Sequence, residues 1–339
     1  MKSNSKNKAA AVLLWVLIAC VSVVAQPQPP GQTNQPTLSP DEQKMASNIV
    51  AAPDLAAKMK AAGDFIKKYP KSSIRSQVLG NLASQVAKVT DNAQRLTLAQ
   101  ELQTIFTEPA EAEEVGRVVV QAYADANQPD QAFAKGAEFL TRAPDSLDLL
   151  VQLVAMGTDQ VKKQNPKFTP QTMQYTKHAI ELFEGDKKPA GVADARWANY
   201  KSETLPGLYQ TLGLLYFSQG DSATAKLQYT KASQLKPTDP FNFIMLAAML
   251  NQDYQDEAKR YQSMTAGPPR DEQLKKVQAL LDSVIDAYAH SVALSEGVAT
   301  LLQIREQYLQ DLASYYKYRH GGSTEGMQQL IDKYKPVKP

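Results

Sequence analysis

The chain has 339 residues, enough for one large or two ordinary domains, and 43% of them are apolar, so a core can be buried. Its 37 Lys and Arg nearly balance its 35 Asp and Glu, a charge that favours neither nucleic acid nor an anionic membrane surface as a partner. The single cysteine excludes a disulfide framework. With only 16 glycines, the composition favours helices over a β-rich fold.

Residues 1–25 have the pattern of an export signal. Three lysines precede the apolar run Ala9–Ala25, which is short for a transmembrane helix. Cleavage after Val23-Val24-Ala25 is one alternative, and it leaves 37 − 3 = 34 basic residues against 35 acidic ones. Leu17-Ile18-Ala19-Cys20 also resembles the lipobox of bacterial lipoproteins, which makes Cys20 a lipidation candidate; a retained anchor is the third alternative. We expect an exported protein that is periplasmic or envelope-associated, with an outer-membrane lipoprotein as the second form.

A linker and four helices follow the leader. Residues 26–40 contain five prolines and four glutamines, which predicts an extended, polyproline-like tether. Ser39 as N-cap and Pro40 at the first helical position begin the folded region. Helical spacing of apolar residues then predicts helices at about 40–51, 55–69, 72–89 and 91–106.

The segment 112–144 is predicted to form a helical hairpin. Val119, Val120 and Tyr123 precede a turn at 127–129, and Ala132, Phe139 and Pro144 follow it. A second, irregular hairpin is expected from 147–156 and 170–183, joined by a long connection.

Residues 186–203 show little periodicity and are either an inserted loop or an extended bent helix. Arg196, Trp197 and Tyr200 are the residues of this segment that we expect to make contacts.

The clearest unit is 205–237. Its first helix places Tyr209, Leu212, Gly213 and Tyr216 on one stripe, its second places Ala225, Tyr229 and Ala232 on another, and Pro237 closes it. This pattern resembles the tetratricopeptide repeat (TPR), in which large, Leu-Gly, Tyr, Ala, aromatic, Ala and Pro positions recur in about 34 residues. The spacing also repeats within the chain. Tyr123 to Ala132 and Tyr216 to Ala225 are both nine apart, and each alanine lies twelve before its closing proline.

The remaining residues extend the array. We predict a further repeat at 240–266, with a first helix carrying Leu246, Ala247 and Leu250 and a second starting near Ala258. Longer helices at about 271–294 and 297–319 and a short one to 334 are expected to cap the C-terminal end. The predicted fold class is all-α: an α-solenoid of antiparallel helix pairs, similar to a TPR superhelix, across 41–335.

Stacked helix pairs leave a concave groove lined by their first helices. The face about 100° from the buried stripe is the candidate lining. The groove-binding candidates are Arg117, Gln121, Gln210, Leu214, Phe217, Ile244 and Asn251, and the same face also carries Ala124 and Ala248. Contacts with the second helix or with the neighbouring repeat are the alternative for these residues. TPR proteins that grip a partner's terminal carboxylate use Lys and Asn here, and Gln210 and Leu214 do not support that mode.

The sequence contains no signature of catalysis or of a cofactor site. HExxH, GxSxG and phosphate-loop motifs are absent from it. His178, His290 and His320 lie on different predicted helices, so no metal site is expected. The run Tyr315–Arg319 is aromatic and basic, but we interpret it as helix packing and not as a nucleic-acid surface.

The sequence therefore predicts a non-catalytic scaffold of the bacterial cell envelope that binds a protein or peptide in its groove, without a cofactor. One alternative is a lipidated outer-membrane accessory subunit for envelope assembly. A third is an enzyme or glycan-binding protein with its site in 186–203. The membrane is expected to be reached only through the leader or a lipid on Cys20.

Overall fold

The computed structural model describes residues 38–189 and 191–336. Within these ranges the chain forms fourteen α-helices, three single-turn 3₁₀ helices and no strand. The predicted leader, Cys20 and nearly all of the Pro-rich linker lie outside the described residues. No helix of the described part is long and apolar enough to cross a membrane.

The helices follow one another with short connections. The N-terminal ones are α2 (Pro40–Ala51), α3 (Leu55–Lys68), α4 (Arg75–Ala87), α5 (Asn92–Ile105), α6 (Ala112–Asp125), α7 (Pro129–Leu140), α8 (Leu147–Lys162) and α9 (Thr169–Glu184). The C-terminal ones are α10 (Asp194–Ser218), α11 (Ser222–Leu235), α12 (Pro240–Ser263), α13 (Pro268–Leu294), α14 (Leu302–Arg319) and α15 (Met327–Lys333). Short 3₁₀ turns at Pro109–Glu111, Pro166–Phe168 and Ala299–Leu301 precede α6, α9 and α14.

Helix starts are set by the local sequence. The side chains of Ser39, Asp54, Asp91 and Asp221 each accept a hydrogen bond from the backbone N–H three residues on, at 3.2, 2.8, 2.7 and 3.0 Å. Each bond satisfies an N–H that the helix itself leaves without a partner. Gly220 lies between α10 and α11 with φ of +81°, a left-handed conformation that glycine adopts without strain.

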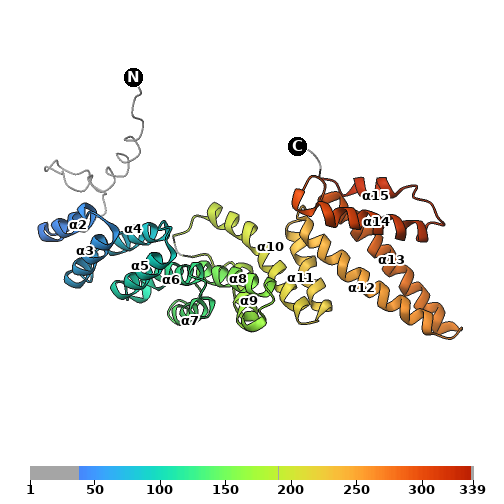
Figure 1. The fold of residues 1–339 in the computed structure, drawn as a ribbon, viewed down its shortest axis with the longest axis horizontal. Coiled ribbons are helices and arrows are strands. Elements are labelled where there is room, and N and C mark those ends of the chain that lie inside the picture. The colour runs from blue at the N-terminus through green and yellow to red at the C-terminus, as the bar shows by residue number, and fades with distance from the viewer. Residues whose placement is uncertain (1–37, 190, 337–339) are drawn as a thin grey trace, which may run out of the picture.

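The helices pack as antiparallel pairs, and the pairs follow one another in an elongated molecule from α2 to α15 (Figure 1). The pairs α6–α7, α8–α9, α10–α11 and α12–α13 are the main contacts, and the first helices α4, α6, α8 and α10 also pack against one another in succession. This arrangement confirms the predicted all-α solenoid of helix pairs.

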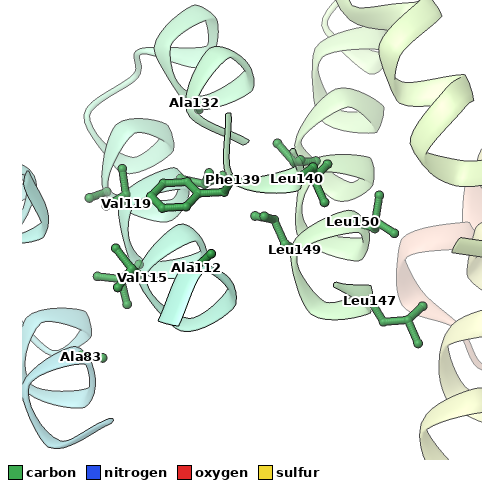
Figure 2. Close-up of a cluster of buried hydrophobic side chains, with 14 of the residues drawn as sticks. Ala83, Ala112, Val115, Val119, Ala132, Phe139, Leu140, Leu147, Leu149 and Leu150 are labelled. Atoms are coloured by element: carbon green, nitrogen blue, oxygen red, sulfur yellow. The ribbon is translucent and has the colours of Figure 1, made fainter. Parts of the chain in front are cut away.

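The predicted repeats differ in detail because large and small residues exchange places between them. In the unit at 112–144, Gly116 packs so closely against Phe139 that a Cβ on the glycine would lie 2.9 Å from the ring. Figure 2 shows the Phe139 ring pointing from α7 toward Val119 of α6. The equivalent positions at 205–237 hold Tyr209 and Ala232, so the large residue has moved to the first helix.

A second pair shows the same exchange in the opposite direction. A Cβ on Gly213 would lie 2.8 Å from the Tyr229 ring, while the equivalent positions in the earlier unit hold Val120 and Gly136. Both units therefore keep one small partner in each pair, which is what close packing of two helices requires. The unusual residues Gly116 and Val120 of the earlier unit are explained in this way.

The structure resolves the ambiguous segment 186–203 as helix for the most part. Residues from Asp194 onward form the first turns of α10, which continues through Pro206. Trp197 stacks on Phe183 with ring centroids 5.2 Å apart, and its Nε1–H donates to Asp186 at 2.6 Å. The Tyr200 hydroxyl donates to Asp148 at 2.7 Å, whereas Arg196 is exposed. The segment is therefore an extended first helix, packed on α8 and α9.

Two predicted boundaries were wrong. Residues 240–263 form the single helix α12, so the second helix of this pair is α13 and no turn precedes Ala258. The apolar residues that were assigned to two helices in fact lie along the one helix α12. The helix that was predicted to end at Met156 continues to Lys162, because Gly157 is buried against Thr172 of α9 instead of ending α8.

The buried apolar residues form two large cores. The first extends from Ile49 to Leu212 and includes Ala232, so it spans α2 to α11. The second extends from Ala247 to Ile331 and spans α12 to α15. A small cluster of Ala225, Tyr229 and Met249 lies between them, at the contact of α11 with α12. We call α2–α11 the array and α12–α15 the bundle.

Candidate partner-binding surface

The predicted candidates on α6 face the next first helix. The side-chain amide of Gln152 on α8 donates to the carbonyl of Arg117 at 3.1 Å and to Oε1 of Gln121 at 3.0 Å. Arg117 also pairs with Glu114 at 2.8 Å on its own helix. These two candidates therefore border the contact between α6 and α8, and a role in binding stays a prediction for them.

The predicted candidates on α12 are covered by α14. Ile244 is only 5% exposed, and its carbonyl accepts a hydrogen bond from the Tyr308 hydroxyl at 3.2 Å. Asn251 Oδ1 accepts from the Tyr315 hydroxyl at 2.8 Å. Ile244 thus belongs to the interior and Asn251 to a contact between helices, so neither presents an open surface in this structure.

The candidates on α10 have a different environment. Gln210 donates to Asp239, the N-cap of α12, at 2.9 Å, so this end of α10 approaches the next first helix. Leu214 is half-buried, and Phe217 is 43% exposed. By repeat register Gln210 corresponds to Ile244 and Phe217 to Asn251. The position of Phe217 is therefore open, whereas the equivalent position of Asn251 is covered by Tyr315.

The cause is whether side chains cross between neighbouring first helices. Contacts of α4 with α6, α6 with α8 and α8 with α10 are close, whereas those of α10 with α12 and of α12 with α14 are both sparse. Tyr308 and Tyr315 of α14 nevertheless reach across and bond to α12, and among the described residues no such side chains cover α10. The C-terminal half of α10 accordingly keeps apolar side chains in solvent.

On the matching face of α12, sequence reasoning named Ala248 but missed the other residues. Phe241, Met245, Ala248 and Gln252 recur at helical spacing on one side of this helix. Phe241 is 38% exposed, Ala248 and Gln252 are exposed, and Met245 is half-buried. This face lies between the side that contacts α11 and the side that contacts α14. The sequence does indicate this face, because Phe241 and Met245 are four residues apart and so lie on one side of a helix, next to the side that carries Ile244.

The residues named on these faces of α10 and α12 are uncharged, and Gln252 at the end of the set donates to the exposed Asp256 at 2.9 Å. We call this set the junction strip: Leu214, Phe217, Phe241, Met245, Ala248 and Gln252. Apolar side chains gathered on one face of a helical array are typical of contact sites for proteins.

A separate cleft opens on the opposite side of α12. Its volume is about 530 Å³, and its lining is shared by α11, α12 and α13. Phe243, Leu246 and Leu250 form the apolar part, and Lys226, Asp282 and Asp286 are among the polar residues. Lys226 pairs with Asp253, and Asp282 pairs with Arg319. The charges around this cleft therefore have partners within the chain.

The three histidines each have a different set of neighbours. His178 contacts Asp145 at 3.0 Å on the surface, and His320 stacks on Tyr316. The His290 ring lies between the rings of Phe243 and Tyr334, with centroid distances of 3.6 and 4.1 Å. Burial lowers the pKa of His290 to about 4. No group of three or more metal-ligating side chains occurs among the residues that the structure describes.

Comparison with known proteins gives likeness of structure only. No family model and no curated protein matches the chain. A tetratricopeptide repeat protein from Parabacteroides merdae is 12% identical with a TM-score of 0.38, covering 86% of this chain and 96% of that one. The C-terminal part of a TPR repeat-containing protein from Cytophaga hutchinsonii is 12% identical with a TM-score of 0.41, covering 87% and 100%.

A third solved structure comes from the functional characterization of Pseudomonas aeruginosa PilF. It is 12% identical with a TM-score of 0.39, and the match covers 81% of this chain and 99% of that one. Two of the three neighbours are named as TPR proteins.

Proposed function

We propose that this chain is a non-catalytic helical-repeat scaffold that binds a protein segment along the junction strip. The observation that carries the proposal is Phe217, which is 43% exposed at a register position whose counterpart, Asn251, is covered by α14. Exposing this aromatic ring to water costs free energy that an apolar partner would recover. No catalytic residue and no cofactor is assigned.

The chemistry of the strip defines the partner. The side chains are apolar or neutral amides, so contact with apolar residues supplies the affinity and charge pairing does not. The strip on α12 runs from Phe241 to Gln252, which are eleven residue steps apart and so separated by about 16 Å along the helix. A partner segment with apolar side chains at helical spacing over about three turns fits this length.

Site-specific photo-crosslinking tests the proposal. A photoreactive phenylalanine analogue at Phe217 should crosslink one partner through such an apolar segment, identified by mass spectrometry. The matched control is the same analogue at Leu227 of α11, which is 64% exposed but lies outside the strip. The double substitution Phe217→Ser and Met245→Ser should abolish capture by a crosslinker placed elsewhere on the chain. Equal crosslinking at 217 and 227, or none at 217, would contradict the proposal.

We also propose that the protein acts in the bacterial cell envelope. Support comes from the basic and apolar leader and from the lipobox-like Leu17–Cys20. A lipid on Cys20 would make the scaffold an outer-membrane accessory subunit. Metabolic labelling with a fatty-acid analogue distinguishes the two forms: label that is lost in Cys20→Ser indicates the lipoprotein, and unlabelled protein in the periplasmic fraction indicates ordinary cleavage.

A further inference from the structure

The array and the bundle are joined by a thin contact. Apolar residues of the first core end at Leu212 and Ala232, and those of the second begin at Ala247. Between them lies a small apolar cluster of the buried residues Ala225, Tyr229 and Met249, with Tyr216, Met245 and Leu246 partly buried around them. Small interfaces of this kind permit relative motion of the two parts.

This contact also contains buried polar atoms without partners. The Tyr229 hydroxyl and both amide atoms of Asn242 are buried and make no hydrogen bond, and each of these residues is 0% exposed. An unpaired polar group loses its water without compensation, which penalises the packed state. Opening the contact between α11 and α12 would return water to these atoms.

Space is present on both sides of the contact. The cleft of about 530 Å³ lies between α11 and α13 on one side of α12. On the other side, α10 and α12 leave the junction strip exposed. A rotation of the bundle can therefore narrow either side while it widens the other, without a clash of packed cores.

Two polar links cross the contact. Lys226 of α11 pairs with Asp253 of α12, and their side chains are 25% and 33% exposed. Gln210 of α10 donates to Asp239 at the start of α12. Both involve long side chains at or near the surface, and such links can break and form again at low cost.

We propose that the contact between α11 and α12 is a hinge about which the bundle turns against the array, and that this motion regulates access to the junction strip. The hinge follows from the divided core, the unpaired Tyr229 and Asn242 atoms and the space on both sides of α12. Its regulatory meaning rests on the proposed function of the strip.

Distance measurements between spin labels test the hinge. The full chain carrying Cys20→Ser has no other cysteine, so labels can be placed at Gln174→Cys on α9 and Gln278→Cys on α13, both exposed. A control pair at Ser84→Cys and Gln174→Cys lies within the array. We expect the pair across the hinge to give a distance distribution roughly twice as wide as the control, because small interfaces permit domain motion.

Two further variants test the cause of the motion. Asn242→Leu removes the unpaired amide and Tyr229→Phe removes only the unpaired hydroxyl, so each should narrow the distribution across the hinge and leave the control pair unchanged. Tyr229→Phe keeps the ring and serves if Asn242→Leu fails to fold.

A distribution across the hinge as narrow as the control, or one that neither variant narrows, would overturn the proposal. This result is independent of partner capture. A rigid junction with specific crosslinking at Phe217 would refute only the hinge, and a mobile junction without crosslinking would refute only the binding function.

Discussion

Two successive contacts between first helices, α10 with α12 and α12 with α14, share the same repeat register but differ in how they are closed. At the second, Tyr308 and Tyr315 of α14 reach across and bond to Ile244 and Asn251. At the first, the equivalent contact is limited to Gln210 with Asp239, and Phe217 stays exposed. Repeat register therefore places residues on a face, while the approach of the next helix decides whether that face is core or surface.

The largest expected difference between the two contacts is in their share of stability. The Tyr315 ring stacks on Tyr288 with ring centroids 6.1 Å apart. Its hydroxyl accepts a hydrogen bond from Gln255 and donates one to Asn251. Tyr315→Ala should lower the free energy of unfolding of the bundle by about 3 kcal/mol. Phe217→Ala should change it by less than about 0.5 kcal/mol.

Urea unfolding followed by tyrosine and tryptophan fluorescence measures both variants. Since the two cores are separate, we expect two transitions, with Tyr315→Ala shifting only the one that belongs to the bundle. A single transition that shifts as a whole would show that the two regions unfold together.

Glycine substitutions on α10 should give effects of opposite sign. A Cβ on Gly213 would lie 2.8 Å from the Tyr229 ring, and Gly213→Ala should destabilise the array by roughly 1–3 kcal/mol through overpacking. A Cβ on Gly207 would have no neighbour within 4 Å, so Gly207→Ala should stabilise it by up to about 1 kcal/mol through helix propensity. Thermal unfolding of both variants beside the parent chain measures the difference; equal shifts would contradict it.

Two tyrosines of the same unit provide a smaller contrast. The Tyr209 hydroxyl donates to Glu184, whereas the Tyr229 hydroxyl has no partner. Tyr209→Phe should therefore cost about 1 kcal/mol, and Tyr229→Phe should be neutral or stabilising. Midpoints of urea unfolding compare the pair, and a larger loss for Tyr229→Phe would show that its hydroxyl is bonded in solution.

The last contrast is a pH dependence that His290 adds to the bundle. Burial between Phe243 and Tyr334 lowers the pKa of His290 from 6.5 to about 4, despite the nearby carboxylate of Asp286. The unfolded chain then takes up a proton near pH 6.5 and the folded chain only near pH 4. The stability that comes from burying neutral imidazole is present in full above pH 6.5 and is lost as the pH falls toward 4.

His290→Phe keeps the stacked ring and removes the proton, so the bundle transition should become less sensitive to pH between 6.5 and 4. The array transition serves as the internal reference. An unchanged pH slope in the variant would mean that His290 is solvated in the native protein.

Much of the fold could be predicted because its signals are local. The caps Ser39, Asp54, Asp91 and Asp221 and the spacing of Tyr209, Gly213 and Tyr216 act within one or two helical turns. The sequence did not show that 240–263 is a single helix, because the same apolar spacing fits one long helix or two short ones. Of the predicted groove residues, Leu214, Phe217 and Ala248 belong to the proposed junction strip and Ile244 is buried, while Phe241 and Met245 were not predicted.

The sequence by itself determined that this chain is a series of paired helices with small residues where the pairs approach. Gly116 with Phe139 and Gly213 with Tyr229 show this, because neighbours within one hairpin are close in sequence and must fit in size. Only the tertiary structure decided that α14 covers α12 while α12 leaves α10 open. That outcome depends on side chains that reach between helices of different pairs, such as Tyr308 and Tyr315 of α14, which lie 64 residues from their partners on α12 and belong to no local pattern.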